Sequence, residues 1–196
     1  MRFVLGFLAL VQAGCASELV VRAPDTVRVP RPSPLADLEP LAVSIGPIEG
    51  APDSGAPVGE RGAAFLQPGG PIYLTDTPSR ALRRTLEETL SGAGHRVVRE
   101  DAQVHLAPRL LEFRLDAPRD GGAWAVAVRV GVSLRVTATP GDRNWDEMRG
   151  RSERSQRVLW RPGTTTLESV LAGCLEDLAA VLADSDELAA ALAAVA

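Results

Sequence analysis

The feature that most constrains this fold is a stretch of strict apolar alternation in the middle of the chain. From Trp124 to Val136 every even-numbered residue is large and apolar, whereas the odd-numbered positions are mostly small or polar. A period of two residues is typical of a β-strand with one face on a core and the other near solvent. The alternation therefore predicts a strand of about 14 residues in a one-sided sheet.

Two segments carry the spacing of amphipathic helices instead. Thr77 and Pro78 are favoured at an N-cap and a first helical position, and leucines follow at every fourth residue before Gly92. Thr165 and Glu168 have the spacing of a capping box. They precede an apolar stripe made by Leu167, Val170, Leu171, Cys174, Leu175, Leu178, Val181 and Leu182. An alanine-rich helix is expected to follow residues 184–187.

Shorter runs predict the remaining strands, over residues 41–48, 95–98, 104–116 and 148–160. Pro108 marks a bulge or an edge position. Residues 49–71 are rich in Gly, Pro and Ala, which predicts a long loop with at most a brief strand around Phe65. This order of elements predicts an α+β domain over residues 41–196: an antiparallel sheet of about 4–6 strands with two or three helices on one face.

The N-terminus has the composition of a bacterial export signal. Arg2 precedes a nine-residue apolar run, which is too short to span a bilayer, and Gln12-Ala13-Gly14-Cys15 follows. Small residues directly before a cysteine resemble the lipobox of lipoprotein precursors, although Gln12 stands where Leu is preferred. The resemblance implies a signal peptide over residues 1–14 and lipid attachment at Cys15. One alternative is an ordinary signal peptide, cut near Ala13 or Ala16, in which Cys15 has no role. The other is a buried N-terminal helix.

Residues 15–40 predict a proline-rich tether that carries the lipid. Five prolines, at positions 24, 30, 32, 34 and 40, favour an extended, semi-rigid spacer. A strip that docks a partner in the polyproline conformation is the alternative.

Composition narrows the chemistry that this chain could perform. The net charge is −4 and all 21 basic residues are arginine, so a nucleic-acid partner is not expected. With 2 His and 2 Cys, neither a metal site nor a cofactor is expected, and the chain is not expected to be an enzyme. Cys174 or His105 could serve a small hydrolase. A buried thiol and a solvated strand histidine are the plainer interpretations.

Arginines on two strands suggest a binding surface. Odd positions share one face of a strand, and the arginines at such positions are Arg129, Arg135, Arg149, Arg151 and Arg157. We expect this face to bind anionic head groups or glycans, or else to be a solvated surface with acidic neighbours. Arg154 falls on the other face.

The order of these elements carries a family resemblance. A lipobox, a proline-rich stretch, the strand Leu41-Ala42-Val43-Ser44-Ile45-Gly46-Pro47 and the helix over residues 80–90, followed by Gly94 and a short Val-Val strand, resemble YajG-type envelope lipoproteins. They are also similar to PqiC-like auxiliary lipoproteins of ABC-type lipid transporters. The resemblance covers most of residues 15–183. It implies a non-enzymatic, membrane-tethered α+β domain, and it transfers Cys15 alone as a functional residue.

These observations lead to three functional hypotheses. The first is a lipid-anchored accessory module of the bacterial envelope, on the outer membrane and facing the periplasm, which contacts another envelope protein or lipid and supports lipid or outer-membrane transport. The second is a structural lipoprotein that binds the cell wall. The third is the small hydrolase, which a deep pocket joining Cys174 to His105 would favour.

Overall fold

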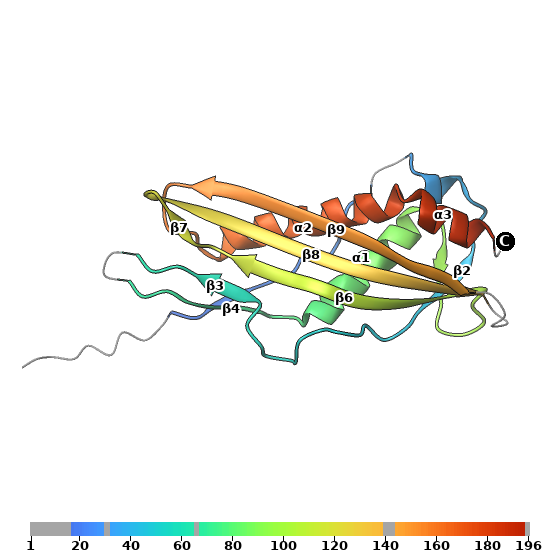
Figure 1. Cartoon of the computed structure of the whole chain (residues 1–196), viewed down its shortest axis with the longest axis horizontal. Coiled ribbons are helices and arrows are strands. Elements are labelled where there is room, and N and C mark those ends of the chain that lie inside the picture. The colour runs from blue at the N-terminus through green and yellow to red at the C-terminus, as the bar shows by residue number, and fades with distance from the viewer. Residues whose placement is uncertain (1–16, 30–31, 65–66, 139–143, 195–196) are drawn as a thin grey trace, which may run out of the picture.

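A computed structural model describes residues 17–29, 32–64, 67–138 and 144–194. A three-stranded sheet has the order β1 (Leu19–Val21), β4 (Gly70–Leu74), β3 (Gly59–Arg61). A larger, six-stranded sheet contains β2 (Ala42–Ile45), β5 (Arg96–Val97), β6 (Val104–Asp116), β7 (Arg119–Asp120), β8 (Ala123–Ala138) and β9 (Asn144–Val158). The helices are η1 (Pro34–Asp37), α1 (Pro78–Gly92), α2 (Thr164–Ala183) and α3 (Asp186–Ala193). The α+β class is confirmed (Figure 1).

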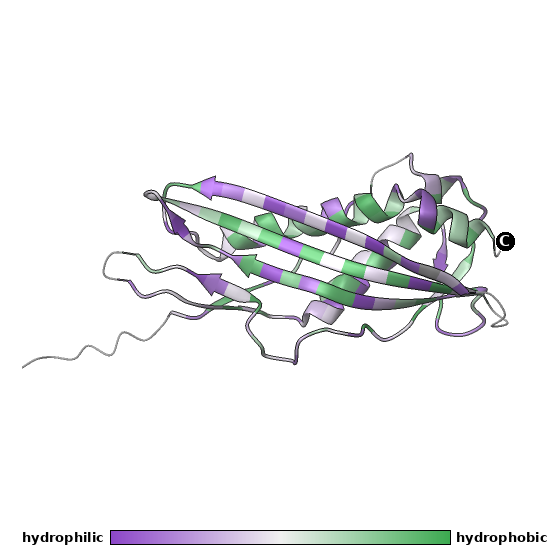
Figure 2. Cartoon of the chain, in the orientation of Figure 1, coloured by the Kyte–Doolittle hydropathy of each residue, from purple (hydrophilic) through white to green (hydrophobic). Residues whose placement is uncertain are grey.

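The long strands β6, β8 and β9 form an antiparallel ribbon with α1 and α2 behind it (Figure 1). The even-numbered residues of β8 from Trp124 to Val136 face the helices and are almost completely buried, as the alternation predicts. Figure 2 shows the same alternation as bands of apolar and polar colour along β8. β9 begins at Asn144, earlier than expected, and the register shift in β6 falls between Leu110 and Glu112 instead of at Pro108.

The larger sheet is mixed, and this differs from the expected antiparallel arrangement. β2 runs parallel to both β5 and β6. The reason is connectivity, because the chain passes from β2 through β3, β4 and α1 before it returns to β5. A crossover of this kind brings the chain back in the same direction.

Both long helices bury the apolar residues that their patterns predict, except that Val181 of α2 is 43% exposed. Only α1 is capped as predicted. The Thr77 hydroxyl accepts a hydrogen bond from the Arg80 amide at 3.3 Å, and Pro78 is the first helical residue. α2 begins after Gly163, which offers no side-chain cap, so the predicted capping box is wrong. Glu168 instead accepts a hydrogen bond from the distant Arg22 amide at 3.0 Å. Within the described ranges, no helix has both the length and the apolarity that a membrane crossing requires.

Part of the predicted loop over residues 49–71 is ordered as strand. β3 and the start of β4 pair as an antiparallel hairpin in this segment. β3 is also bound to β6, since the Leu115 amide donates to the Val58 carbonyl at 2.9 Å. The strand expected around Phe65 lies outside the described residues.

The expected tether is part of the folded body, and this corrects the boundary at residue 41. β1 pairs with β4 in parallel, with Leu19 opposite Ile72 and Val21 opposite Leu74. Val21, Ala23, Val27 and Leu35 are buried in the common core. Apolar residues before and between the prolines therefore dock the segment, and proline density alone did not indicate this.

Burial of His95 makes part of the stability of this domain depend on pH. The ring is 3% exposed, and its Nδ1 accepts a hydrogen bond from the Leu41 amide at 3.2 Å. Desolvation lowers the pKa of His95 below 6.5, while the backbone of Leu35 opposes the shift. His95 therefore binds a proton more readily in the unfolded chain than in the folded protein. The resulting stability is present above pH ~6.5 and is lost as the pH falls below it.

We expect the variant His95→Asn to lose less stability than the wild type as the pH falls from about 7 to about 5. Asparagine keeps an acceptor for the Leu41 amide but does not titrate in this range. Urea unfolding at several pH values gives the slope of the unfolding free energy against pH for each of the two proteins. Equal slopes would contradict the assignment of this acid sensitivity to His95.

Candidate functional site

The five arginines of the expected binding surface share the outer face of the larger sheet, opposite the helices. In the β8–β9 register, Gly131 lies opposite Arg151, Ser133 opposite Arg149 and Ala125 opposite Arg157, and the remaining two, Arg129 and Arg135, occupy odd positions of β8. Arg154 lies on the helix side, where its Nη1 approaches the Asp177 carboxylate of α2 at 3.4 Å. The parity of the sequence therefore assigned these side chains to the correct faces.

Acids from neighbouring strands neutralise three of these five arginines. Glu112 on β6 lies 3.5 Å from Arg129 and 3.4 Å from Arg151. Asp120 on β7 lies 3.6 Å from Arg157. Exposed ion pairs of this kind contribute about 0–1 kcal/mol each, so they do little for stability. Their effect is to leave much of the outer face close to neutral.

Positive charge remains concentrated around Glu147. The Ser133 hydrogen bond, followed by the charges of Arg149, Arg109 and Arg135, holds the pKa of Glu147 below its ordinary value. These three arginines are exposed, and within the described residues none has a carboxylate within 4.0 Å. We call Arg109, Arg135 and Arg149 the basic cluster. Arg109 was not among the expected residues because it comes from β6, and only strand pairing brings it beside Ser133.

Cys174 is a core residue. It is fully buried, with its Sγ 3.2 Å from the Ser152 hydroxyl and 3.6 Å from the Val128 carbonyl. Burial raises the pKa of the Cys174 thiol, with a smaller opposing effect from the Ser152 hydrogen bond. Because the thiolate is the nucleophilic form, this position does not suit attack on a substrate. The burial of Cys174 therefore disfavours a hydrolase that uses this thiol as its nucleophile.

We expect the Cys174 thiol to resist alkylation in the folded protein at pH ~8 and to react fully once the chain is unfolded. Mass spectrometry after iodoacetamide treatment, with and without urea, measures both states. Rapid labelling of the native protein would contradict the burial of this side chain.

His105 lines a surface pocket of about 830 Å³ that does not include Cys174. Its Nδ1 lies 3.0 Å from the Ser44 hydroxyl, and that hydroxyl is also 3.4 Å from the Val104 carbonyl. In the same pocket, Arg83 donates hydrogen bonds to the carbonyls of Ile45 and Gly46 at 3.2 and 2.6 Å. His105 thus pairs with Ser44 in this pocket. The hydrogen bonds of the Ser44 and Arg83 side chains are made largely to the backbone and to residues that hold β2 in place. Among the described residues, no group of three His, Cys, Asp or Glu side chains could hold a metal ion.

Two arginines hold the start of the described chain. Arg61, which is 7% exposed, donates from Nη2 to the Ser17 hydroxyl at 2.6 Å and to the Ser17 carbonyl at 3.2 Å. Arg161 reaches the same hydroxyl at 3.3 Å and the Pro68 carbonyl at 2.6 Å. Desolvation, together with the neighbouring charge of Arg161, lowers the pKa of Arg61. Ser17 is thereby bound to the β3–β4 hairpin and to the segment that leads into α2.

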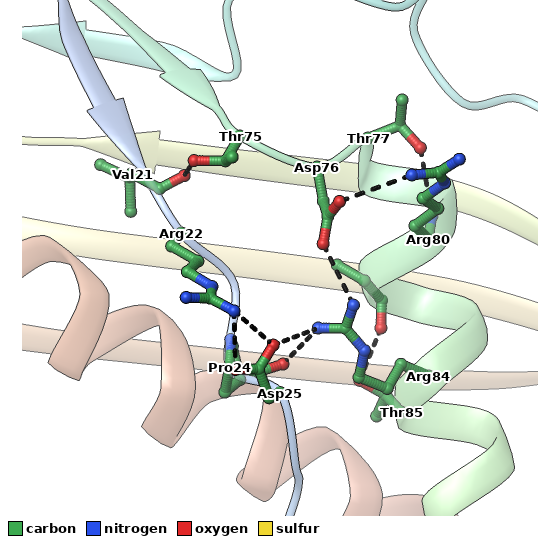
Figure 3. Close-up of polar contacts among 11 residues, drawn as sticks. Val21, Arg22, Pro24, Asp25, Thr75, Asp76, Thr77, Arg80, Arg84 and Thr85 are labelled. Atoms are coloured by element: carbon green, nitrogen blue, oxygen red, sulfur yellow. Dashed lines mark hydrogen bonds and ion pairs between the residues drawn. The ribbon is translucent and has the colours of Figure 1, made fainter.

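The chain that follows β1 is fastened to both long helices, and Figure 3 shows its contacts with α1. Asp25 lies 2.8 Å from Arg22 and 3.8 Å from Arg84 of α1, and Arg84 also approaches Asp76 at 3.1 Å. The Arg22 amide adds the hydrogen bond to Glu168 of α2. The hydrogen bond from Arg22 to Glu168 could not be predicted from local sequence, because the partners are separated by 146 positions.

Two large apolar side chains are exposed just after β9. Leu159 is 76% exposed and Trp160 is 73% exposed, whereas Trp145, at the opposite end of β9, packs against the core. Because Arg161 contacts Ser17, this pair lies at the end of the molecule where the chain enters the body. Figure 1 shows that β9 ends, and the β3–β4 hairpin projects, at this same end.

Comparison with solved structures shows a shared fold. A Xanthomonas campestris protein of the DUF330 family matches with a TM-score of 0.65 and 9% identity, over 90% of this chain and 99% of that one. At this identity the likeness establishes the architecture alone. No protein-family model matches the sequence, and neither does any curated protein.

More distant similarities include proteins described as lipoproteins. A minor lipoprotein from Acinetobacter baumannii has a TM-score of 0.41 and 15% identity, over 61% of this chain and 87% of its own. A lipoprotein from Neisseria meningitidis has a TM-score of 0.36 and 9% identity, over 71% of this chain and 99% of its own.

Proposed function

We propose that this protein is a lipid-anchored, non-enzymatic accessory module of the bacterial envelope. The observation that carries the proposal joins sequence to structure: the lipobox-like cysteine, Cys15, lies two residues before Ser17, which the folded body binds through Arg61 and Arg161. A lipid at Cys15 would therefore tie the whole domain to a membrane. One acyl chain gives only reversible binding, whereas several hold a protein stably without a spanning helix.

The basic cluster is our proposed contact surface for a partner. Arg109, Arg135 and Arg149 present three positive charges around the single carboxylate of Glu147 on an open sheet face. This arrangement suits an acidic surface of another envelope protein. The resemblance to YajG-type and PqiC-like lipoproteins makes lipid or outer-membrane transport the process that we propose the partner serves, and it favours an outer-membrane location facing the periplasm.

The anchor is tested by intact mass and membrane fractionation of three forms of the full chain. We expect the wild type to lose residues 1–14, gain acyl mass and sediment with outer membranes. Cys15→Ser should show neither acylation nor membrane retention. Cys174→Ala is the matched control, because it removes the other cysteine and should leave anchoring intact. A soluble wild type that is cut elsewhere would refute the lipoprotein assignment.

The contact surface is tested by crosslinking in intact cells. The double variant Arg135→Glu/Arg149→Glu should lose the neighbour that crosslinks to the wild type. The control Arg80→Glu reverses a charge on α1, far from this face, and should keep the neighbour. If isolated peptidoglycan retains the wild type but not the same double variant, the partner of this surface is the cell wall and not another protein.

A further inference from the structure

The connection between the proposed lipid and the folded body is very short. If Cys15 is acylated, as proposed above, only residue 16 separates it from Ser17, and two residues span at most about 7 Å. Ser17 is held by Arg61 and Arg161, and two residues later the chain enters β1. The bilayer surface must then lie against the end of the molecule that binds Ser17.

The side chains at this end suit a lipid surface. Leu159 and Trp160 are largely exposed, and Trp160 precedes the arginine that contacts Ser17. Tryptophan favours the membrane–water interface because its ring is apolar while its N–H remains polar. Without such a surface, two adjacent large apolar side chains would stay in water.

Positive charge accompanies the apolar pair. Arg61 and Arg161 lie close enough for one to affect the pKa of the other, and neither has a carboxylate within 4.0 Å among the described residues. Their Nε atoms are buried without hydrogen-bond partners in the described structure. Two uncompensated guanidiniums beside the anchor are attracted to the phosphates of a bilayer.

We propose that this end, which we call the anchor end (Ser17, Leu159, Trp160 and Arg161), rests on the bilayer, with Leu159 and Trp160 in the head-group region. The long axis of the β6–β8–β9 ribbon then points away from the membrane, because the ribbon runs from this end to the opposite one (Figure 1). The short connection to the lipid keeps the anchor end at the bilayer, and the basic cluster therefore lies at a distance from the lipid.

The test uses the acylated full-length protein in vesicles of phosphatidylethanolamine and phosphatidylglycerol that contain brominated phosphatidylcholine as a fluorescence quencher. We expect vesicle binding to shift the Trp160 emission to the blue and the brominated lipid to quench roughly half of it or more. Trp160→Phe should abolish the shift and the quenching. Trp124 and Trp145 remain in that variant and report the background.

A matched probe lies at the other end of α2. Val181 is 43% exposed and lies about 26 Å along the helix from Thr164. The variant Trp160→Phe/Val181→Trp places an indole there, and its emission should not be quenched by the brominated lipid.

The outcomes separate this inference from the proposed function. Acylated protein whose Trp160 is no more quenched than the Val181→Trp probe would overturn the orientation and leave the lipid anchor standing. The orientation is also overturned, with the lipid anchor left standing, if Trp160 is shielded from aqueous acrylamide in native membranes but not in vesicles that hold no other protein. In that case another protein, and not the bilayer, covers Trp160. Absence of acyl mass at Cys15 would refute both proposals.

Discussion

Replacing Leu171 by alanine is expected to lower the free energy of unfolding by about 2–5 kcal/mol. Leu171 is fully buried on α2, which packs against β8, β9 and α1. The substitution removes apolar contacts and leaves a cavity that the surrounding strands can fill only in part. Urea denaturation monitored by circular dichroism measures the change. The slope of the transition should stay constant, because the fold still unfolds as a unit.

The control for this prediction lies on the same helix. Val181→Ala also removes apolar atoms from α2, but Val181 is substantially exposed, so we expect a change within about 0.5 kcal/mol. Equal losses in the two variants would contradict the assignment of the contribution of α2 to core packing around Leu171.

Replacing Gly59 by alanine is expected to destabilise the protein by about 3 kcal/mol, since it forces β3 away from β6. A Cβ at this position would clash with the Leu115 carbonyl oxygen, a backbone atom that cannot move alone. The approach is held by backbone hydrogen bonds from Leu115 to Val58 and from Ala117 to Glu60, both at 2.9 Å. Amide hydrogen exchange at Leu115 and Ala117 should accelerate together with the loss of stability.

Gly131 provides the matched control for this substitution. It is also a strand glycine, but a Cβ there would meet Leu111 and Glu112 at 3.6–3.7 Å, which is ordinary van der Waals contact. Gly131→Ala should therefore change stability by less than about 0.5 kcal/mol. If the two alanine variants behave alike, the close approach of β3 to β6 is not what makes Gly59 necessary.

Periodic elements were predictable because their signal is local. The alternation from Trp124 to Val136, the stripe of α2 and the Thr77-Pro78 start of α1 each depend on neighbours within a few residues. The periodicity of a helix or a strand determines which residues share a face. The core residues and the arginines of the outer face could therefore be assigned from the sequence.

The contacts that the sequence did not predict have a different physical origin. Glu168 had a local role available at the start of α2, yet it binds the Arg22 amide 146 positions away. The acids that neutralise Arg129 and Arg151 come from β6, and only the strand register brings them within range. Local spacing carries no information about which distant backbone or charge will arrive at a given position.

The N-terminal segment separates the two kinds of information most clearly. The sequence by itself determined the candidate anchor, because an export signal and a lipobox are read as a linear string around Cys15. Only the tertiary structure decided that the proline-rich stretch is not a spacer. Val21 and Leu35 enter the core, and β1 pairs with β4, because burying these apolar side chains and satisfying the backbone outweighs the freedom of an extended tether.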